Sequence, residues 1–103
     1  MAAITDEQVE RVRALVAAVP PGRVTTYGDI AAAAALSSPR IVAWIMRTDS
    51  SDLPWHRVIR ASGRPAPRLS TRQLELLRAE GVLARDGRVA LSGQNSVRHE
   101  FPD

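Results

Sequence analysis

Helix-breaking residues divide the first half of the chain into segments that are each the length of a short helix. Pro20-Pro21-Gly22 and Ser37-Ser38-Pro39 form two such breaks, because proline has no backbone N–H to donate and glycine favours turns over helix. The longest apolar run, residues 30–36, is far too short to cross a bilayer. The spacing therefore predicts several short helices joined by tight turns.

The first segment carries a helix start signal. Thr5-Asp6-Glu7-Gln8 has the form of a capping box, in which the first and last side chains bond each other's backbone N–H, and it predicts a helix to about Val19. Five apolar residues recur at helical spacing and should face the core: Val9, Val12, Leu15, Val16 and Val19.

The next two segments predict a pair of short helices. Residues 24–27 favour extended backbone and residues 28–36 a short helix. Ser38-Pro39 can then cap and start another helix, which ends near Thr48. Two short helices joined by a tight break, with an arginine at the start of the second, resemble a helix-turn-helix.

The second half of the chain predicts a strand, a helix and a hairpin. Residues 56–60 indicate a short buried strand, and Ser70-Thr71 should cap a helix that runs to Ala79. Residues 82–91 alternate around Asp86-Gly87, which is a strong hairpin signal. We expect one domain over residues 1–103, with a loosely ordered tail after about residue 93.

Composition narrows the class of protein. All fourteen positively charged residues are arginine, and the net charge is +3; arginine grips phosphate through two donors and stacks on flat rings. The chain has no cysteine, so disulfides, thiolate metal sites and thiol nucleophiles are excluded. The first residues, MAAITDEQVERV, lack the pattern of a signal peptide, so we expect a soluble cytoplasmic (intracellular) protein.

Three segments together carry a family resemblance. They are VPPGRVTTYGDIA (residues 19–31), SPRIVAWIMR (38–47) and LPWHRVI (53–59). They resemble the C-terminal DNA-binding domain of the O6-alkylguanine-DNA alkyltransferases, and more closely its cysteine-less relatives, the alkyltransferase-like proteins. The resemblance covers Glu7 to Val82. It implies a mainly α fold with a small β component, a winged helix-turn-helix.

The resemblance gives Trp55 a particular meaning. In the enzymes a cysteine follows the proline of this motif and takes the alkyl group from guanine, whereas here Trp55 follows Pro54. Because that transfer needs a thiolate and the chain holds none, alkyl transfer by this route is excluded. His56 and Glu80 match a proton relay of the enzymes. With no thiol to deprotonate, their simpler role is to fix the site loop through hydrogen bonds, and Arg57 is expected to anchor the same loop.

Further residues match DNA-binding positions of the family. Tyr27 matches a tyrosine that helps to rotate the target nucleotide, and Arg40 matches the finger that fills the gap left by the base. Arg47 matches an arginine near the DNA backbone, and Arg68 one that lies over the bound guanine. We therefore assign DNA or lesion binding to Tyr27, Arg40, Arg47, Pro54, Trp55 and Arg68.

Each of these matches has an alternative. Tyr27 can also be interpreted as a core residue that covers the first helix, although we favour the DNA-binding role, and Arg47 and Arg68 can be interpreted as solvated surface charges. The finger alignment places Ala43 and Trp44 where relatives hold two glycines, and a second register would match Arg40 to an earlier arginine and leave no finger. We prefer the first register, because the plane of a guanidinium suits an unstacked base step.

The resemblance implies a DNA damage sensor without catalytic residues. It would bind O6-alkylguanine in double-stranded DNA through the minor groove, flip the lesion into a pocket and mark it for nucleotide excision repair proteins. We expect a monomer with no cofactor, no metal site and no membrane partner. Two other classes stay open. One is a helix-turn-helix regulator of undamaged sequence, and the other is an enzyme that uses His56 as general base with Asp49 or Glu80.

Overall fold

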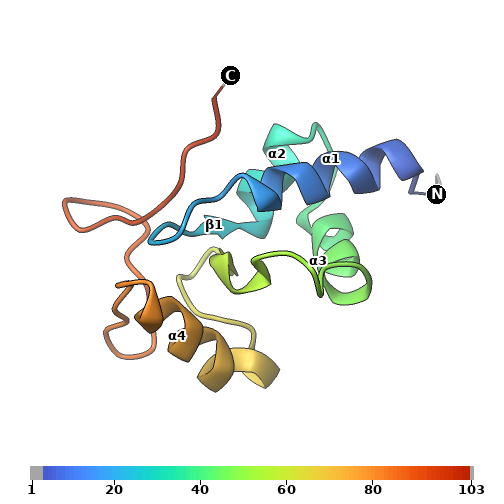
Figure 1. Cartoon of the computed structure of the whole chain (residues 1–103). Coiled ribbons are helices and arrows are strands. Elements are labelled where there is room, and N and C mark those ends of the chain that lie inside the picture. The colour runs from blue at the N-terminus through green and yellow to red at the C-terminus, as the bar shows by residue number, and fades with distance from the viewer. Residues whose placement is uncertain (1–3, 103) are drawn as a thin grey trace.

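The computed structural model describes residues 4–102. In chain order the elements are α1 (Asp6–Ala17), β1 (Thr25–Thr26), α2 (Tyr27–Ala33), α3 (Pro39–Thr48), the 3-10 turn η1 (Trp55–Arg57), β2 (Val58–Ile59), the 3-10 turn η2 (Pro67–Leu69) and α4 (Ser70–Ala79). Figure 1 shows α1, α2 and α3 gathered on one side of the molecule and α4 on the other. The mainly α fold with a small β component is confirmed. None of the helices in this described part is long and apolar enough to cross a membrane.

The predicted capping box forms at the start of α1. The Gln8 N–H donates to Thr5 Oγ1 at 3.1 Å, and the Thr5 N–H donates to Gln8 Oε1 at 2.9 Å. The helix ends at Ala17, slightly earlier than expected. Val12 and Val16 are fully buried, so the helical periodicity identified the face that packs on the core.

The two helices that follow pack against α1 and against each other. α2 begins at Tyr27 because Thr26 Oγ1 accepts from the Asp29 N–H at 3.0 Å and so caps the helix. Ser38 caps α3 as predicted, with its hydroxyl accepting from the Arg40 N–H at 3.1 Å. The first core cluster consists of apolar residues from these three helices and β2, among them Val12, Val16, Ile30, Val42, Ile45 and Val58.

The sheet is a single parallel pair that joins the two halves of the chain. Thr25 pairs with Val58 and Thr26 with Ile59. The expected strand over residues 56–60 is shorter than predicted, because its first residues belong to η1, where the Arg57 N–H donates to the Pro54 carbonyl at 3.0 Å. Tyr27, which directly follows β1, is thereby placed beside the segment that carries the PWHRV motif.

The start of α4 differs from the prediction. Ser70 is the first helical residue and not the cap, and Leu69 precedes it without a side-chain hydrogen bond to the helix end. The reason is that η2 leads directly into the helix, so that Ser70 already has helical backbone angles. α4 ends as expected, with Gly81 in the left-handed region at φ +88°.

The predicted hairpin forms only as a single β-bridge, between Arg85 and Arg88. Asp86 and Gly87 adopt φ of +52° and +76°, and Arg85 and Arg88 exchange both backbone hydrogen bonds at 2.8 and 2.9 Å. The next residue, Val89, donates its N–H to the Gly63 carbonyl at 2.8 Å. The wing of the expected fold is therefore a tight turn bonded to the loop before η2.

The tail is docked beside Val24, the residue that precedes β1, and is not loose as expected. The Val24 N–H donates to Val97 at 2.9 Å, and the His99 N–H donates to Val24 at 2.7 Å. Arg98 makes two hydrogen bonds of 2.7 Å to the Asp29 carboxylate on α2. Figure 1 shows the C-terminal segment running past the loop that follows α1. The partners in these contacts are about seventy positions apart in the sequence. Local sequence patterns do not predict contacts over such a separation.

Candidate nucleic-acid interface

A cluster of charged side chains fixes the PWHRV segment to the rest of the molecule. Arg57 donates to both carboxylate oxygens of Glu80, from Nε at 3.0 Å and from Nη2 at 2.6 Å, and His56 Nε2 lies 2.8 Å from Glu80 Oε2. Arg57 Nη1 also donates to the Val19 carbonyl at 2.9 Å. Arg57 and Glu80 together thus join the segment after α1, η1 and the end of α4.

The electrostatics of the cluster favour an ionised Glu80. Hydrogen bonds from Arg57, which have the largest effect, and from His56 lower the pKa of the Glu80 carboxyl to about 2, although burial opposes them. The side chains of Arg57 and Glu80 are only 13% and 16% exposed. At neutral pH the carboxylate therefore already accepts bonds from both neighbours, an arrangement suited to holding a loop.

Gln73 holds the same segment from the other side, and sequence analysis missed it. Its side chain is 2% exposed, and its Nε2 donates to the carbonyls of His56 at 3.0 Å and Val58 at 2.7 Å. One signal was available: Gln73 lies one helical turn before the buried Leu77 on α4, so a polar residue stands on the core-facing side of that helix.

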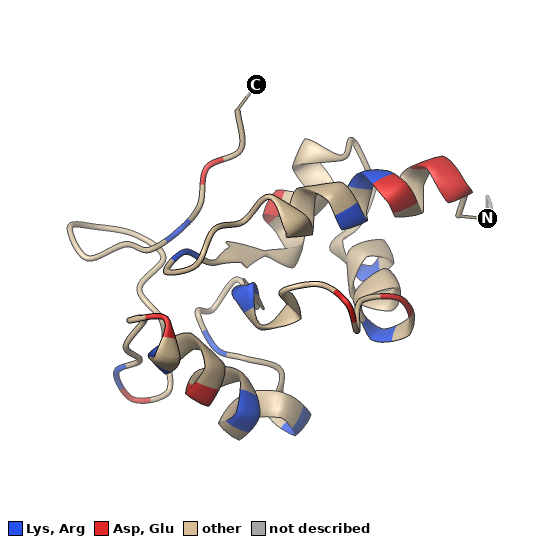
Figure 2. Cartoon of the chain, in the orientation of Figure 1, with Lys and Arg blue, Asp and Glu red and all other residues tan. Residues whose placement is uncertain are grey.

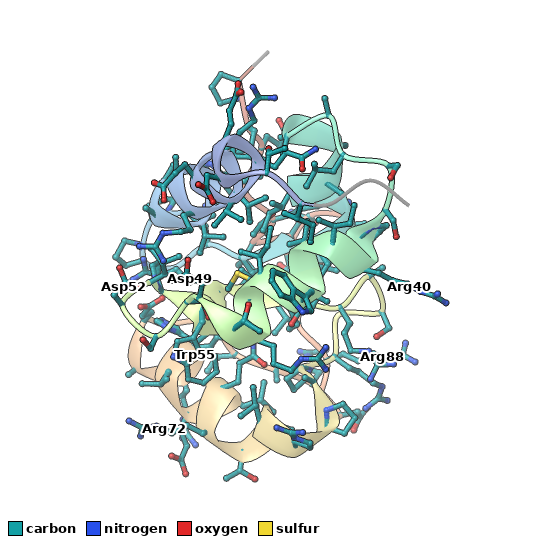
Figure 3. All side chains as sticks on the ribbon, turned by 90° about the vertical axis from the view of Figure 1, so that its right-hand side faces the viewer. Arg40, Asp49, Asp52, Trp55, Arg72 and Arg88 are labelled. Carbon is teal, nitrogen blue, oxygen red and sulfur yellow. The ribbon has the colours of Figure 1, made fainter. Side chains whose placement is uncertain are left out.

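The loop between α3 and η1 is tied to α1 by Arg13, which sequence analysis also missed. Its guanidinium donates to the Asp49 carbonyl at 2.8 Å and to Asp52 Oδ2 at 2.6 Å. The hydrogen bond from Arg13 lowers the pKa of the Asp52 carboxyl. Both loop carboxylates, labelled in Figure 3, are therefore bonded within the protein.

A cavity of about 530 Å³ lies between α3, η1 and the start of α4. It brings together four of the predicted site residues, namely Tyr27, Arg47, Trp55 and Arg68. Its other lining residues are mostly small or apolar: Ala43, Met46, Thr48, Ser50, Ser51, Val58, Ala66, Pro67, Leu69 and Gln73. Burial raises the pKa of the Tyr27 hydroxyl, so Tyr27 presents a neutral phenol. The size and the mixed polar and apolar lining are those of a site for a small organic group.

Two of the six predicted DNA- or lesion-binding residues, Arg40 and Pro54, are not among the residues that line this cavity. Arg40 is the second residue of α3 and is exposed, and Figure 3 shows its side chain extending away from the body of the molecule. Pro54 is half-buried and directly precedes η1. Figure 2 shows arginine within α3, and the sequence of α3 contains no acidic residue.

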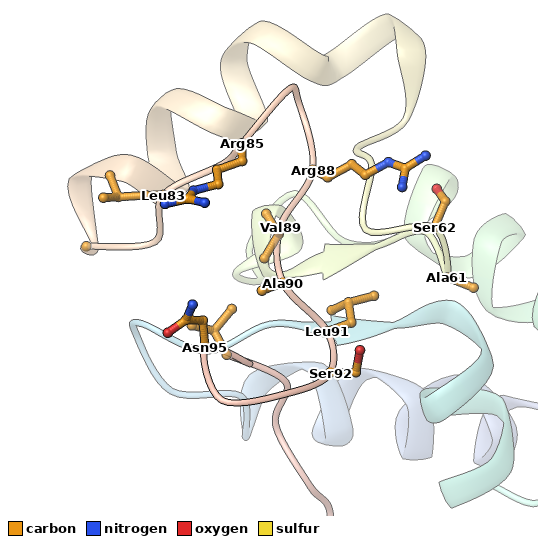
Figure 4. A pocket seen from close by; sticks show the side chains of 12 residues that line it. Ala61, Ser62, Leu83, Arg85, Arg88, Val89, Ala90, Leu91, Ser92 and Asn95 are labelled. Atoms are coloured by element: carbon orange, nitrogen blue, oxygen red, sulfur yellow. The ribbon is translucent and has the colours of Figure 1, made fainter.

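A second, larger hollow of about 750 Å³ is shown in Figure 4. It is lined by Ala61, Ser62, Gly81 and residues between Leu83 and Val97. None of the predicted site residues lines it, and its charged side chains are Arg85 and Arg88. The smaller cavity is therefore the candidate site, because it is the one that the family motifs surround.

The fold and this cavity define a DNA-binding domain of the alkyltransferase type. The family model for the DNA-binding domain of 6-O-methylguanine DNA methyltransferase matches residues 7–82. The chain belongs to this family. The boundaries agree with the predicted range of Glu7 to Val82, and the predicted resemblance is confirmed.

Several relatives carry the name DNA base-flipping protein. The one from Escherichia coli is 43% identical over 86 residues, which are 76% of this chain and 64% of the relative. The chain thus matches less than two thirds of that protein's length. A relative from Vibrio parahaemolyticus is 34% identical over 92 residues, which are 84% of this chain and 92% of the relative.

Solved structures show the same fold. S. pombe Atl1 in complex with damaged DNA containing O6-carboxymethylguanine has a TM-score of 0.71 at 34% identity, over 79% of this chain and 82% of that one. S. pombe ATL in complex with DNA has a TM-score of 0.73 at 31% identity, and the match covers 87% of this chain and 93% of that one. Mycobacterium tuberculosis OGT in complex with DNA has a TM-score of 0.63 at 31% identity, and the match covers 76% of this chain and 51% of that one.

Proposed function

We propose that this chain binds duplex DNA at O6-alkylguanine, turns the damaged nucleotide out through the minor groove and holds it without removing the alkyl group. The observation that carries the proposal is the cavity lined by Tyr27, Trp55 and Arg68. An aromatic ring and a guanidinium on the wall of one cavity provide flat surfaces for a base that has left the stack.

The energetics favour a damaged base over an intact one. Extruding a nucleotide costs roughly a few kcal/mol, and the cost is smaller where the base is badly paired. Arg40 is expected to fill the gap in the duplex, and Arg47 to contact a phosphate. Minor-groove entry with an inserted side chain bends the duplex. The base-flipping names of the relatives and the Atl1–DNA complex support this assignment.

Trp55 explains why binding is the end point. The chain has no cysteine, so no thiolate can accept the alkyl group. The His56–Arg57–Glu80 cluster then serves to hold the loop that presents Trp55. Because the lesion stays in place, the persistent complex is the signal, which nucleotide excision repair proteins would read inside the cell.

A regulator of undamaged sequence is the alternative within the DNA-binding class. Such a protein reads base edges with polar side chains on its second helix, chiefly arginine, asparagine or glutamine. The sequence of α3, PRIVAWIMRT, has arginines only near its two ends and no amide side chain. This composition favours a helix that enters a groove without reading the sequence.

Fluorescence anisotropy with two labelled duplexes tests the proposal. The duplexes are identical except for one guanine or O6-methylguanine, and the lesion duplex should bind at least tenfold more tightly. Arg68→Ala should reduce this preference by about tenfold, because a guanidinium stacked on a base contributes about 1–2 kcal/mol.

Arg72→Ala is the matched control for Arg68→Ala. Arg72 is exposed on α4, close in sequence to Arg68, and is not among the residues that line the cavity. It should retain the full preference for the lesion. Equal affinity of the unmodified protein for both duplexes would overturn the proposed function.

A further inference from the structure

α3 presents an exposed face that combines two arginines with an indole ring. Residues three or four positions apart share a face of a helix, so Arg40, Ala43, Trp44 and Arg47 form one continuous strip, which we call the α3 strip. All four are exposed. The opposite face of α3 is fully buried at Val42 and Ile45, so the orientation of the helix is fixed by the core.

Trp44 is unusual on such a surface. Its side chain is 47% exposed, in a chain with only two tryptophans. Large apolar side chains are normally buried, because each Å² of apolar area removed from water stabilises the fold by about 25 cal/mol. Among the side-chain hydrogen bonds of residues 4–102, Trp44 takes part only through its backbone carbonyl, which accepts from Thr48 Oγ1 at 2.8 Å. The indole is therefore free to contact another molecule.

The surroundings of Trp44 indicate the chemistry of that molecule. Ala43 and Arg47 of the α3 strip also line the cavity, so the strip runs to the rim of the candidate site. Arg40 and Arg47 have no carboxylate within salt-bridge distance in the part of the chain that the structure describes. The nearby carboxylates of Asp49 and Asp52 bond Arg13 instead. A partner with regular negative charges and flat apolar groups between them fits this strip, and nucleic acid has both.

We infer that Trp44 is a DNA-contacting residue, which enters the minor groove edge-on beside Arg40 and packs on the sugars and base edges of the duplex. The inference rests on the proposed function, since it takes α3 as the helix that meets the duplex. The minor groove of B-DNA is about 6 Å wide, and apolar side chains that enter it part neighbouring base steps. The two tryptophans then have different roles: Trp55 faces the lesion, and Trp44 contacts any duplex.

Single-tryptophan variants test this division. Trp55→Phe leaves Trp44 as the only indole, and Trp44→Phe leaves Trp55. With Trp55→Phe, both the intact and the O6-methylguanine duplex should quench the emission and shield the indole from acrylamide. With Trp44→Phe, only the lesion duplex should change the emission of Trp55.

Affinity measurements give the second readout. Trp44→Ala should weaken binding to both duplexes by about tenfold, the effect of losing one aromatic contact to nucleic acid, and should leave the ratio between them within about twofold. Leu83→Ala is the control, because Leu83 is 72% exposed and lines the other hollow. It should bind like the unmodified protein.

The outcomes separate the two proposals. If labelled-DNA anisotropy shows lesion-specific binding while Trp44 stays accessible to acrylamide and Trp44→Ala binds normally, the role of Trp44 is wrong and the proposed function stands. If Trp44 becomes shielded as protein concentration rises without DNA, its partner is a second copy and the inference fails. If the unmodified protein shows no lesion preference, the proposed function itself fails.

Discussion

Replacing Arg57 by methionine is expected to lower the free energy of unfolding at pH 7 by about 3 kcal/mol, as is typical when one partner of a buried ion pair is removed. The variant leaves the Glu80 carboxylate, 16% exposed, without its bidentate donor. It also removes the donor to the Val19 carbonyl. Urea unfolding followed by circular dichroism measures the change.

The effect of Arg57→Met should depend on pH in a defined direction. The pKa of Glu80 is about 2 in the folded protein, against an ordinary value of 4.5. A lowered pKa stabilises the fold fully above pH 4.5, and this contribution is lost as the pH falls from 4.5 to about 2. Since Arg57 is the main cause, the difference in stability between the two proteins should shrink by about 1–2 kcal/mol over this window, after solvent screening is taken into account.

Arg72→Met is the control for this experiment, because Arg72 lies on the exposed face of α4 with Glu75 at 3.9 Å. It should change the free energy of unfolding by less than about 0.5 kcal/mol at any pH. A loss of stability for Arg57→Met as small as that of Arg72→Met would show that the cluster does not hold the site loop.

Arg40→Ala is expected to weaken binding to the O6-methylguanine duplex by about thirtyfold, or about 2 kcal/mol. The reason is that Arg40, exposed at the start of α3, would replace the stacking and pairing contacts that the extruded base leaves behind. Removal of one ordinary phosphate contact should instead weaken the binding of all duplexes alike.

A single-stranded oligonucleotide with the same lesion sharpens this test. A single strand has no gap to fill, so Arg40→Ala should bind it nearly as well as the unmodified protein does. Arg78→Ala, which removes an exposed arginine from the last turn of α4, is the control on the duplex. If Arg40→Ala and Arg78→Ala have equal effects on the lesion duplex, Arg40 is not the finger.

Sequence analysis located the elements whose signals are local. The capping box at Thr5 and Gln8 and the cap at Ser38 are bonds between residues two or three positions apart, so a short window contains both partners. The turn at Asp86-Gly87 was found for the same reason. The family resemblance predicted Tyr27, Trp55 and Arg68 as site residues, and these three residues line one cavity.

The parts that were missed depend on contacts between distant residues. Gln73 bonds carbonyls fifteen and seventeen positions away, and Arg13 bonds a loop thirty-six to thirty-nine positions away. The tail pairs with Val24, although its own composition is polar and predicts no strand. In each case the decisive partner is supplied by the fold and not by the neighbouring sequence.

The central claim is that the protein recognises the lesion and leaves it unchanged. The most direct test incubates excess O6-methylguanine duplex with the protein, separates the two and determines the intact mass of the protein and the lesion content of the DNA. The account predicts an unchanged protein mass and a full content of O6-methylguanine in DNA that had been bound. A protein heavier by one methyl group in place of a hydrogen, with a matching loss of lesion, would contradict it.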